Sequence, residues 1–92
     1  MTAGDCLSYA NAIGKELEWR LKWAGNQAVI GAAANGSMQY AQDHIREGCT
    51  MSRKGIERMH EVGCDARLIQ RVEEWRSVFR LDLGDGHQLA CP

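Results

Sequence analysis

The chain has 92 residues, with 11 Lys and Arg against 12 Asp and Glu, and its formal net charge at pH 7 is −1. This length allows one small domain, residues 1–92, and no second core. No segment approaches the roughly 18 apolar residues that a membrane-spanning helix requires, and the N-terminus lacks the basic and then apolar pattern of a secretory signal. We therefore expect a soluble, cytoplasmic protein that does not bind a membrane.

The first predicted helix begins at Asp5, whose carboxylate can accept hydrogen bonds from free backbone N–H groups, and ends near residues 25–26. One face of this helix is a predicted core face, made of Cys6, Ala10, Ile13, Leu17, Leu21 and Ala24. A second stripe lies roughly opposite and contains Tyr9, Ala12, Trp19 and Trp23, interrupted by Glu16. A helix packed on one side needs only one apolar face, so this stripe is expected to cover another part of the chain or a second protein.

The middle of the chain carries turn signals between apolar residues. Asn35-Gly36 predicts a break between two helices, with Ser37 as the second N-cap, and a continuous helix is the alternative. Gly48 is expected to end this element and Ser52 to cap the next one. Two shorter helices should then meet at Gly63, which stops the first of them, and at Asp65, which caps the second.

The last helix has a strong amphipathic pattern, formed by Leu68, Val72, Trp75 and Phe79. Beyond it, Leu81 and Leu83 alternate with charged residues before the turn at residues 84–86, which indicates a short C-terminal β-hairpin. These patterns predict a mainly α fold, a compact bundle of four to five helices with a helix-turn-helix-like corner near residues 53–80.

The corner from Ile56 to Val72 resembles the helix-turn-helix motif of DNA-binding proteins, with Gly63 in the turn between apolar residues. Met59 departs from that pattern, because a small residue usually stands there. The resemblance implies nucleic-acid contacts by Arg53, Lys54, Arg67, Gln70 and Arg71. From Arg46 to Arg80, however, the sequence contains eight basic residues and six acidic ones, and this surplus of positive charge is small for a DNA-binding surface. The same turn is similar to the opening of ubiquitin-associated domains, but it lacks their aromatic contact residue.

The four cysteines are Cys6, Cys49, Cys64 and Cys91, and none of them forms a Cys-x-x-Cys pair. Disulfides persist chiefly in oxidising compartments, and no secretory signal is evident, so we expect reduced thiols buried as small apolar side chains.

His44, Cys49, His60 and Cys64 are weak candidates for a zinc site. Residues 44 and 49 fall on different sides of a helix, and Gly63 interrupts the helix between residues 60 and 64, so no metal or other cofactor is expected. The chain also lacks a nucleophile elbow, a phosphate-binding glycine loop and recognisably spaced paired carboxylates. We therefore predict no catalytic residue and no enzymatic activity.

The aromatic stripe remains as the most informative feature. Large aromatic side chains dominate the binding energy of protein interfaces, and exposed apolar patches on monomers usually mark a contact. We expect a small protein-interaction module or inhibitor, of the kind that phages or mobile elements direct at a host complex, with Tyr9, Trp19 and Trp23 at an interface with a protein partner or a second copy. The alternative is a helix-turn-helix transcriptional regulator that binds DNA.

Overall fold

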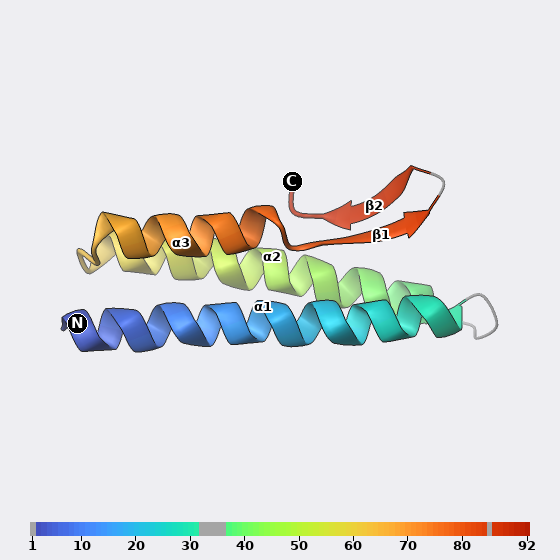
Figure 1. Ribbon diagram of the computed structural model, residues 1–92, viewed down its shortest axis with the longest axis horizontal. Coiled ribbons are helices and arrows are strands. Elements are labelled where there is room, and N and C mark those ends of the chain that lie inside the picture. Colours follow the sequence, from blue (N-terminus) through green and yellow to red (C-terminus); the bar gives the residue numbers. More distant parts are fainter. Residues whose placement is uncertain (1, 32–36, 85) are drawn as a thin grey trace.

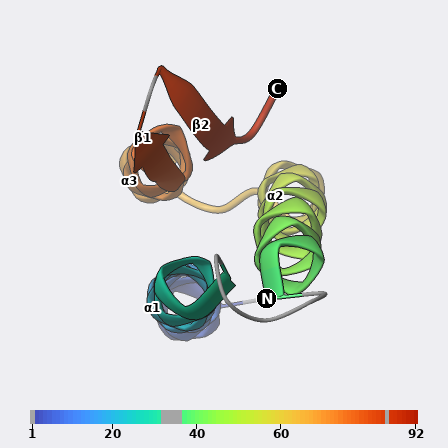
Figure 2. The ribbon, with the colours of Figure 1, turned by 90° about the vertical axis from the view of Figure 1, so that its right-hand side faces the viewer.

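The computed structural model describes residues 2–31, 37–84 and 86–92, and this part of the chain forms an antiparallel helical bundle that continues into a β-hairpin. The elements are α1 (Ala3–Gly31), α2 (Ser37–Glu61), α3 (Ala66–Ser77), β1 (Arg80–Gly84) and β2 (His87–Ala90). The helices run in alternating directions with nearly parallel axes (Figure 1), and in the end-on view they occupy the corners of a triangle (Figure 2). The molecule is 47 Å long, which matches the span of the 29-residue α1 at about 1.5 Å per residue.

The mainly α class is confirmed, but the prediction of four to five helices is wrong. The described residues contain three helices, because two of the expected boundaries do not exist. α1 continues past residues 25–26 to Gly31, and α2 passes without a break through Gly48 and Ser52. The break expected at Asn35-Gly36 lies outside the described residues, and Ser37 is the first residue of α2.

Packing explains why Gly48 and Ser52 lie inside a helix. A Cβ atom on Gly48 would lie 2.6 Å from Cζ of Phe79, so this glycine makes room for the phenyl ring and does not end the helix. Ser52 is fully buried, and its hydroxyl donates a 3.1 Å hydrogen bond to the carbonyl oxygen of Cys49 one turn earlier. That bond satisfies a polar group that would otherwise be costly to bury in mid-helix.

The N-terminus of α1 is capped by a reciprocal pair of hydrogen bonds. The backbone N–H of Thr2 donates to the carboxylate of Asp5, and the backbone N–H of Asp5 donates to the hydroxyl of Thr2. The backbone hydrogen bond from Thr2, and then that involving its side chain, lowers the pKa of Asp5 below its ordinary value. The cap therefore stabilises the fold above the usual Asp pKa, and this contribution is lost as the pH falls through the lowered value.

The turn between α2 and α3 confirms the roles predicted for Gly63 and Asp65. Gly63 has a φ of +76°, and the N–H groups of Gly63 and Cys64 donate to the carbonyls of His60 and Met59, the pattern of a Schellman motif. The carboxylate of Asp65 then accepts a 2.7 Å hydrogen bond from the N–H of Arg67 at the start of α3.

We expect Gly63→Ala to lower the free energy of unfolding by about 1 kcal/mol, because a Cβ atom strains the left-handed backbone conformation although no side chain lies within 4 Å of it. Gly25→Ala is the matched control, since this helical site has only ordinary contact with Leu81 and should gain up to about 1 kcal/mol from helix propensity. Urea unfolding followed by circular dichroism measures both. Equal effects of the two substitutions would contradict the assigned turn.

The core lies between the helices and under the hairpin, and most of the predicted α1 face is buried in it. The residues of that face with less than a tenth of their surface exposed are Cys6, Ala10, Ile13, Leu17 and Ala24, whereas Leu21 is partly buried. α2 contributes Ala41, Ile45, Cys49 and Met59, and the last helix and the linker after it contribute Ile69, Val72 and Phe79.

The expected helix-turn-helix-like corner is absent, because α2 and α3 do not cross at a steep angle. Figures 1 and 2 show α2 and α3 side by side and antiparallel, whereas the helices of a helix-turn-helix motif cross at roughly 90–120°. The physical reason is that both helices pack along α1, which aligns their axes with its own. Met59, at the position where the motif has a small residue, is fully buried in the core.

The expectation of reduced cysteines is contradicted by two disulfides. Cys6 is bonded to Cys64, which joins the start of α1 to the α2–α3 turn, and Cys49 is bonded to Cys91, which joins α2 to the segment after β2. The Cα atoms of the two pairs are 5.8 Å and 5.3 Å apart, within the ordinary range. The fold brings together cysteines that are separated by 58 positions in the first pair and by 42 positions in the second. No local pattern in the sequence indicates that these cysteines lie close together.

The predicted C-terminal hairpin is present. β1 and β2 pair antiparallel, with Leu81 opposite Leu89 and an irregularity between Asp82 and Gly84. Gly86 has a φ of +78°, as a tight turn requires, while Asp85 lies outside the described residues. Leu81 and Leu89 pack against the core, so the hairpin extends the cover that α3 provides over α1 and α2.

Candidate functional site

Trp19, Trp23, Tyr40 and His44 form a group of rings at the α1–α2 interface, which we call the aromatic cluster. The ring centroids of Trp19 and Trp23 are 6.0 Å apart, and that of Trp19 is 5.6 Å from the His44 ring in an edge-on arrangement. The Tyr40 and His44 centroids are 4.4 Å apart, also edge-on. Such tilted and edge-on geometries are those that aromatic pairs favour.

Arg20 fixes the base of this cluster. Its Nε donates to Glu16 and its Nη1 donates to Glu47, both at 2.9 Å, and the arginine side chain is only 16% exposed. Nη1 also lies 3.3 Å from Nδ1 of His44 and 3.4 Å from the His44 carbonyl oxygen. Because a guanidinium can only donate, Nδ1 of His44 is the acceptor in this contact. The buried His44 ring is therefore held in place under the tryptophans.

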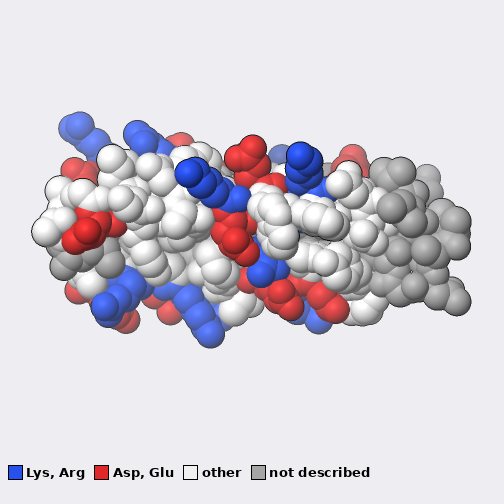
Figure 3. Space-filling model, turned by 90° about the horizontal axis from the view of Figure 1, so that it is seen from below, with Lys and Arg blue, Asp and Glu red and all other residues white. Residues whose placement is uncertain are grey.

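The outer rings of the cluster are widely exposed. Trp19 is 47% exposed, Trp23 42% and Tyr40 46%, whereas His44 beneath them is buried. On the face seen in Figure 3, uncharged side chains cover much of the surface on both sides of a central band of mixed charge. About half of each tryptophan is exposed to solvent, and Trp19 contacts α2 through the His44 ring, so this part of the stripe lies beside α2.

Tyr9 does not join the two tryptophans. It lies about 15 Å along α1 from Trp19, is partly buried, and lines a separate hollow between α1 and α2 with Ile13, Met51 and Lys54. Its hydroxyl approaches Gly55, where a Cβ atom would lie 3.7 Å from the oxygen and 2.5 Å from Cδ1 of Ile13. The three predicted interface residues therefore lie at two places on one side of the bundle.

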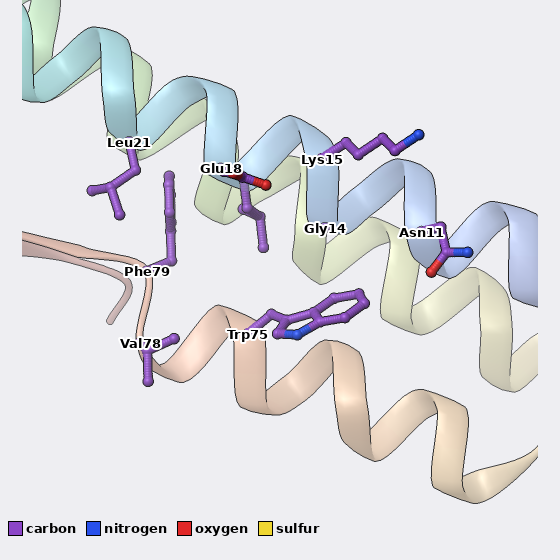
Figure 4. A pocket seen from close by; sticks show the side chains of 9 residues that line it. Asn11, Gly14, Lys15, Glu18, Leu21, Trp75, Val78 and Phe79 are labelled. Carbon is purple, nitrogen blue, oxygen red and sulfur yellow. The ribbon is translucent and has the colours of Figure 1, made fainter.

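A second hollow, of about 410 Å³, lies between α1 and α3 (Figure 4). The Trp75 ring projects from α3 toward Gly14, where a Cβ atom would lie 2.7 Å from Cζ3 of the indole. Leu21, Val78 and Phe79 line the other end, and Val78 is exposed. The hollow is mainly apolar, and the absence of a side chain at Gly14 permits the close approach of the indole.

The residues that would contact nucleic acid are dispersed. Arg67, Gln70 and Arg71 are exposed on α3. Arg53 and Lys54 are exposed on α2, but they line different hollows, since Arg53 faces the hairpin side and Lys54 faces the hollow at Tyr9. The structure therefore does not gather these side chains into one groove-reading surface.

The weak zinc candidates are also separated. Cys49 and Cys64 belong to different disulfides, and so neither offers a thiolate. His44 belongs to the aromatic cluster, while His60 is exposed with its Nε2 4.0 Å from Glu73. Within the described ranges, no group of three or more His, Cys, Asp or Glu side chains could hold a metal ion.

The sequence pattern did not predict that Tyr40, His44 and Arg20 belong to this cluster. The available signal was the matching four-residue spacing of Trp19 with Trp23 and of Tyr40 with His44, which places each pair on one side of its helix.

None of the helices in the described part of the chain is long and apolar enough to cross a membrane. No protein-family model, curated protein or solved structure matches this chain.

Proposed function

We propose that this chain is a non-enzymatic interaction module that binds a protein partner through the aromatic cluster. The observation that supports this proposal most strongly is that Trp19, Trp23 and Tyr40 remain 42–47% exposed, although they come from two different helices and belong to one cluster. Tryptophan and tyrosine are the residues most enriched among those that dominate interface energies.

The support beneath the cluster strengthens this proposal. Arg20 is tied to Glu16 on α1 and to Glu47 on α2, and His44 is wedged between the tryptophan and tyrosine rings. Side chains that are already ordered lose less conformational entropy on binding, which raises the affinity that a given contact area supplies. Glu16 and Glu47, which lie at the border, would form part of a polar rim around an apolar centre.

No observation favours the DNA-binding alternative, because α2 and α3 run antiparallel and the basic side chains face separate hollows. An inhibitor of the phage type stays a prediction. The cytoplasmic location also stays a prediction, and it loses the argument from reduced thiols, since disulfides persist mainly in oxidising environments.

The test is affinity capture with the tagged chain from a lysate of the organism that carries the sequence, followed by quantitative mass spectrometry. Truncation of one interface tryptophan costs about 2 kcal/mol or about 30-fold in affinity, so Trp19→Ala with Trp23→Ala should remove the captured partner. Arg67→Ala with Arg71→Ala is the control and should leave capture unchanged. Both double variants must retain the wild-type circular dichroism spectrum.

Three results would contradict the proposal. The first is that the arginine variant loses the partner while the tryptophan variant keeps it. The second is a shift of random duplex DNA in a gel at about 50 mM salt that depends on Arg67 and Arg71, which would favour the DNA-binding alternative. The third is sedimentation of the chain as a dimer whose formation requires Trp19 and Trp23, because the cluster would then be covered by a second copy.

A further inference from the structure

Two adjoining hollows lie between α2, the end of α3 and the segment after β2, and we call them together the arginine cavity. The first, of about 410 Å³, has Arg46, Arg53 and Arg76 in its wall, and the second, of about 570 Å³, has Arg53, Arg76 and Arg80. Arg53, Arg76, Ala90 and Pro92 line both hollows. The disulfide between Cys49 and Cys91 holds the segment that forms the outer wall against α2.

Arg76 is held at the centre of this cavity by bonds to α2. Its Nε lies 3.1 Å from the Ser52 hydroxyl oxygen and 3.4 Å from the Cys49 carbonyl oxygen, and its Nη2 lies 3.3 Å from the same carbonyl. Ser52 is fully buried and donates its own proton to the Cys49 carbonyl, so it accepts from Arg76. A guanidinium has more N–H groups than these bonds use, and the remaining ones are available to a ligand in a fixed orientation.

The charge in the cavity is unbalanced. Arg46, Arg53 and Arg76 line the first hollow together with Gln42 and Thr50, and no acidic side chain lines it. Glu57 and Glu73 line only the second hollow, where Arg80 is added. Arg53 has no hydrogen bond or ion pair with any other described residue, and Arg46 has only a 4.0 Å pair with Asp43 at an exposed site. The first hollow thus gathers three arginine side chains in a chain whose net charge is −1, and the terminal carboxylate of Pro92 is the one anionic group among its lining residues.

The geometry points to a binding site for the phosphate group of a small organic phosphomonoester, and we propose this as a site distinct from the aromatic cluster. A phosphomonoester carries nearly two negative charges at neutral pH, and arginine forks match its oxygens in bidentate geometry. Ile45, Leu89 and Pro92 give the same hollow an apolar wall for the organic part. Its volume lies in the range of small-molecule sites and exceeds what a phosphate group alone fills.

The probe is phenyl phosphate, titrated into the full oxidised chain at pH 7.5 and followed by amide chemical shifts, with inorganic phosphate and phenol as separate arms. Saturable shifts at α2 residues 42–53 and at residues 89–92 are expected. Arg53→Gln removes one charge-assisted contact and should therefore weaken binding about tenfold or more. Arg53 contacts no other described side chain by hydrogen bond or ion pair, so this substitution should leave the fold intact.

Arg71→Gln is the matched control, because it removes the same charge from an exposed site on α3 outside the cavity and should change the affinity less than about twofold. Phenyl phosphate should bind more tightly than inorganic phosphate, and phenol should not bind. The proposal is overturned by the absence of saturable binding, by equal weakening in Arg53→Gln and Arg71→Gln, or by inorganic phosphate binding as tightly as phenyl phosphate.

Discussion

Removal of the two disulfides is expected to be the most damaging change that can be made to this protein. In the chain-entropy model, closing loops of 58 and 42 residues stabilises the folded state by about 4 kcal/mol for each bridge. The total stability of a small domain is about 5–15 kcal/mol. The loops overlap between residues 49 and 64, so their contributions are not additive, but loss of both should leave the chain largely unfolded at 37 °C.

Three variants measure the effects of the two disulfides individually and together: Cys6→Ala with Cys64→Ala, Cys49→Ala with Cys91→Ala, and all four substitutions combined. Urea unfolding should show a loss of several kcal/mol for each double variant relative to the oxidised parent. The parent kept in a thiol-free phosphine reductant is the chemical counterpart and should resemble the quadruple variant. Alkylation and intact mass under native, non-reducing conditions supply the direct check, and four modified thiols with an unchanged unfolding midpoint would restore the expectation of reduced cysteines.

Met59→Ala is expected to have the largest effect among single side-chain truncations in α2. Met59 is 0% exposed at the junction of the helices, close to the Schellman turn at Gly63. Truncation of a fully buried methionine removes its transfer free energy and leaves a cavity, which together cost about 2–5 kcal/mol. Met51→Ala on the same helix is the control, because Met51 is only partly buried and its truncation should cost clearly less.

This comparison also tests the arrangement of α2 and α3. In a helix-turn-helix motif a small residue at this position lets the helices cross closely, and alanine would then be tolerated or favourable. In the structure, the methionine side chain is fully buried in the core, and alanine leaves a cavity there. Thermal unfolding of the two variants under identical conditions decides the point, and a melting temperature of Met59→Ala at or above that of the parent would contradict the structure described here.

Local patterns predicted those features that depend on neighbouring residues. The 3.6-residue period identified the buried face of α1, and Gly63 and Asp65 marked the end of one helix and the start of the next, because a left-handed backbone and a capping carboxylate are short-range requirements. The alternation of Leu81 and Leu83 with charged residues identified the hairpin for the same reason.

The same local rules misassigned residues whose role depends on distant contacts. The local pattern predicts a helix end at Gly48, yet this glycine makes room for Phe79. It predicts a cap at Ser52, yet this serine is hydrogen-bonded to Cys49 and Arg76 in the core. A glycine or serine has the same local signature in both situations. Only the ring or guanidinium that approaches from another element distinguishes them.

The same distinction between local patterns and distant contacts applies to the candidate sites. Sequence spacing alone determined that Trp19 and Trp23 share one side of α1, because helical geometry places residues four apart on the same face. The same geometry places Tyr9 about 15 Å along the helix from Trp19. The antiparallel return of α2 decided that Tyr40 and His44 complete the cluster. The pairing of the cysteines and the approach of Arg76 to Arg46 and Arg53 on α2 were likewise decided by tertiary structure, since each joins residues more than 20 positions apart that only packing around a shared core brings together.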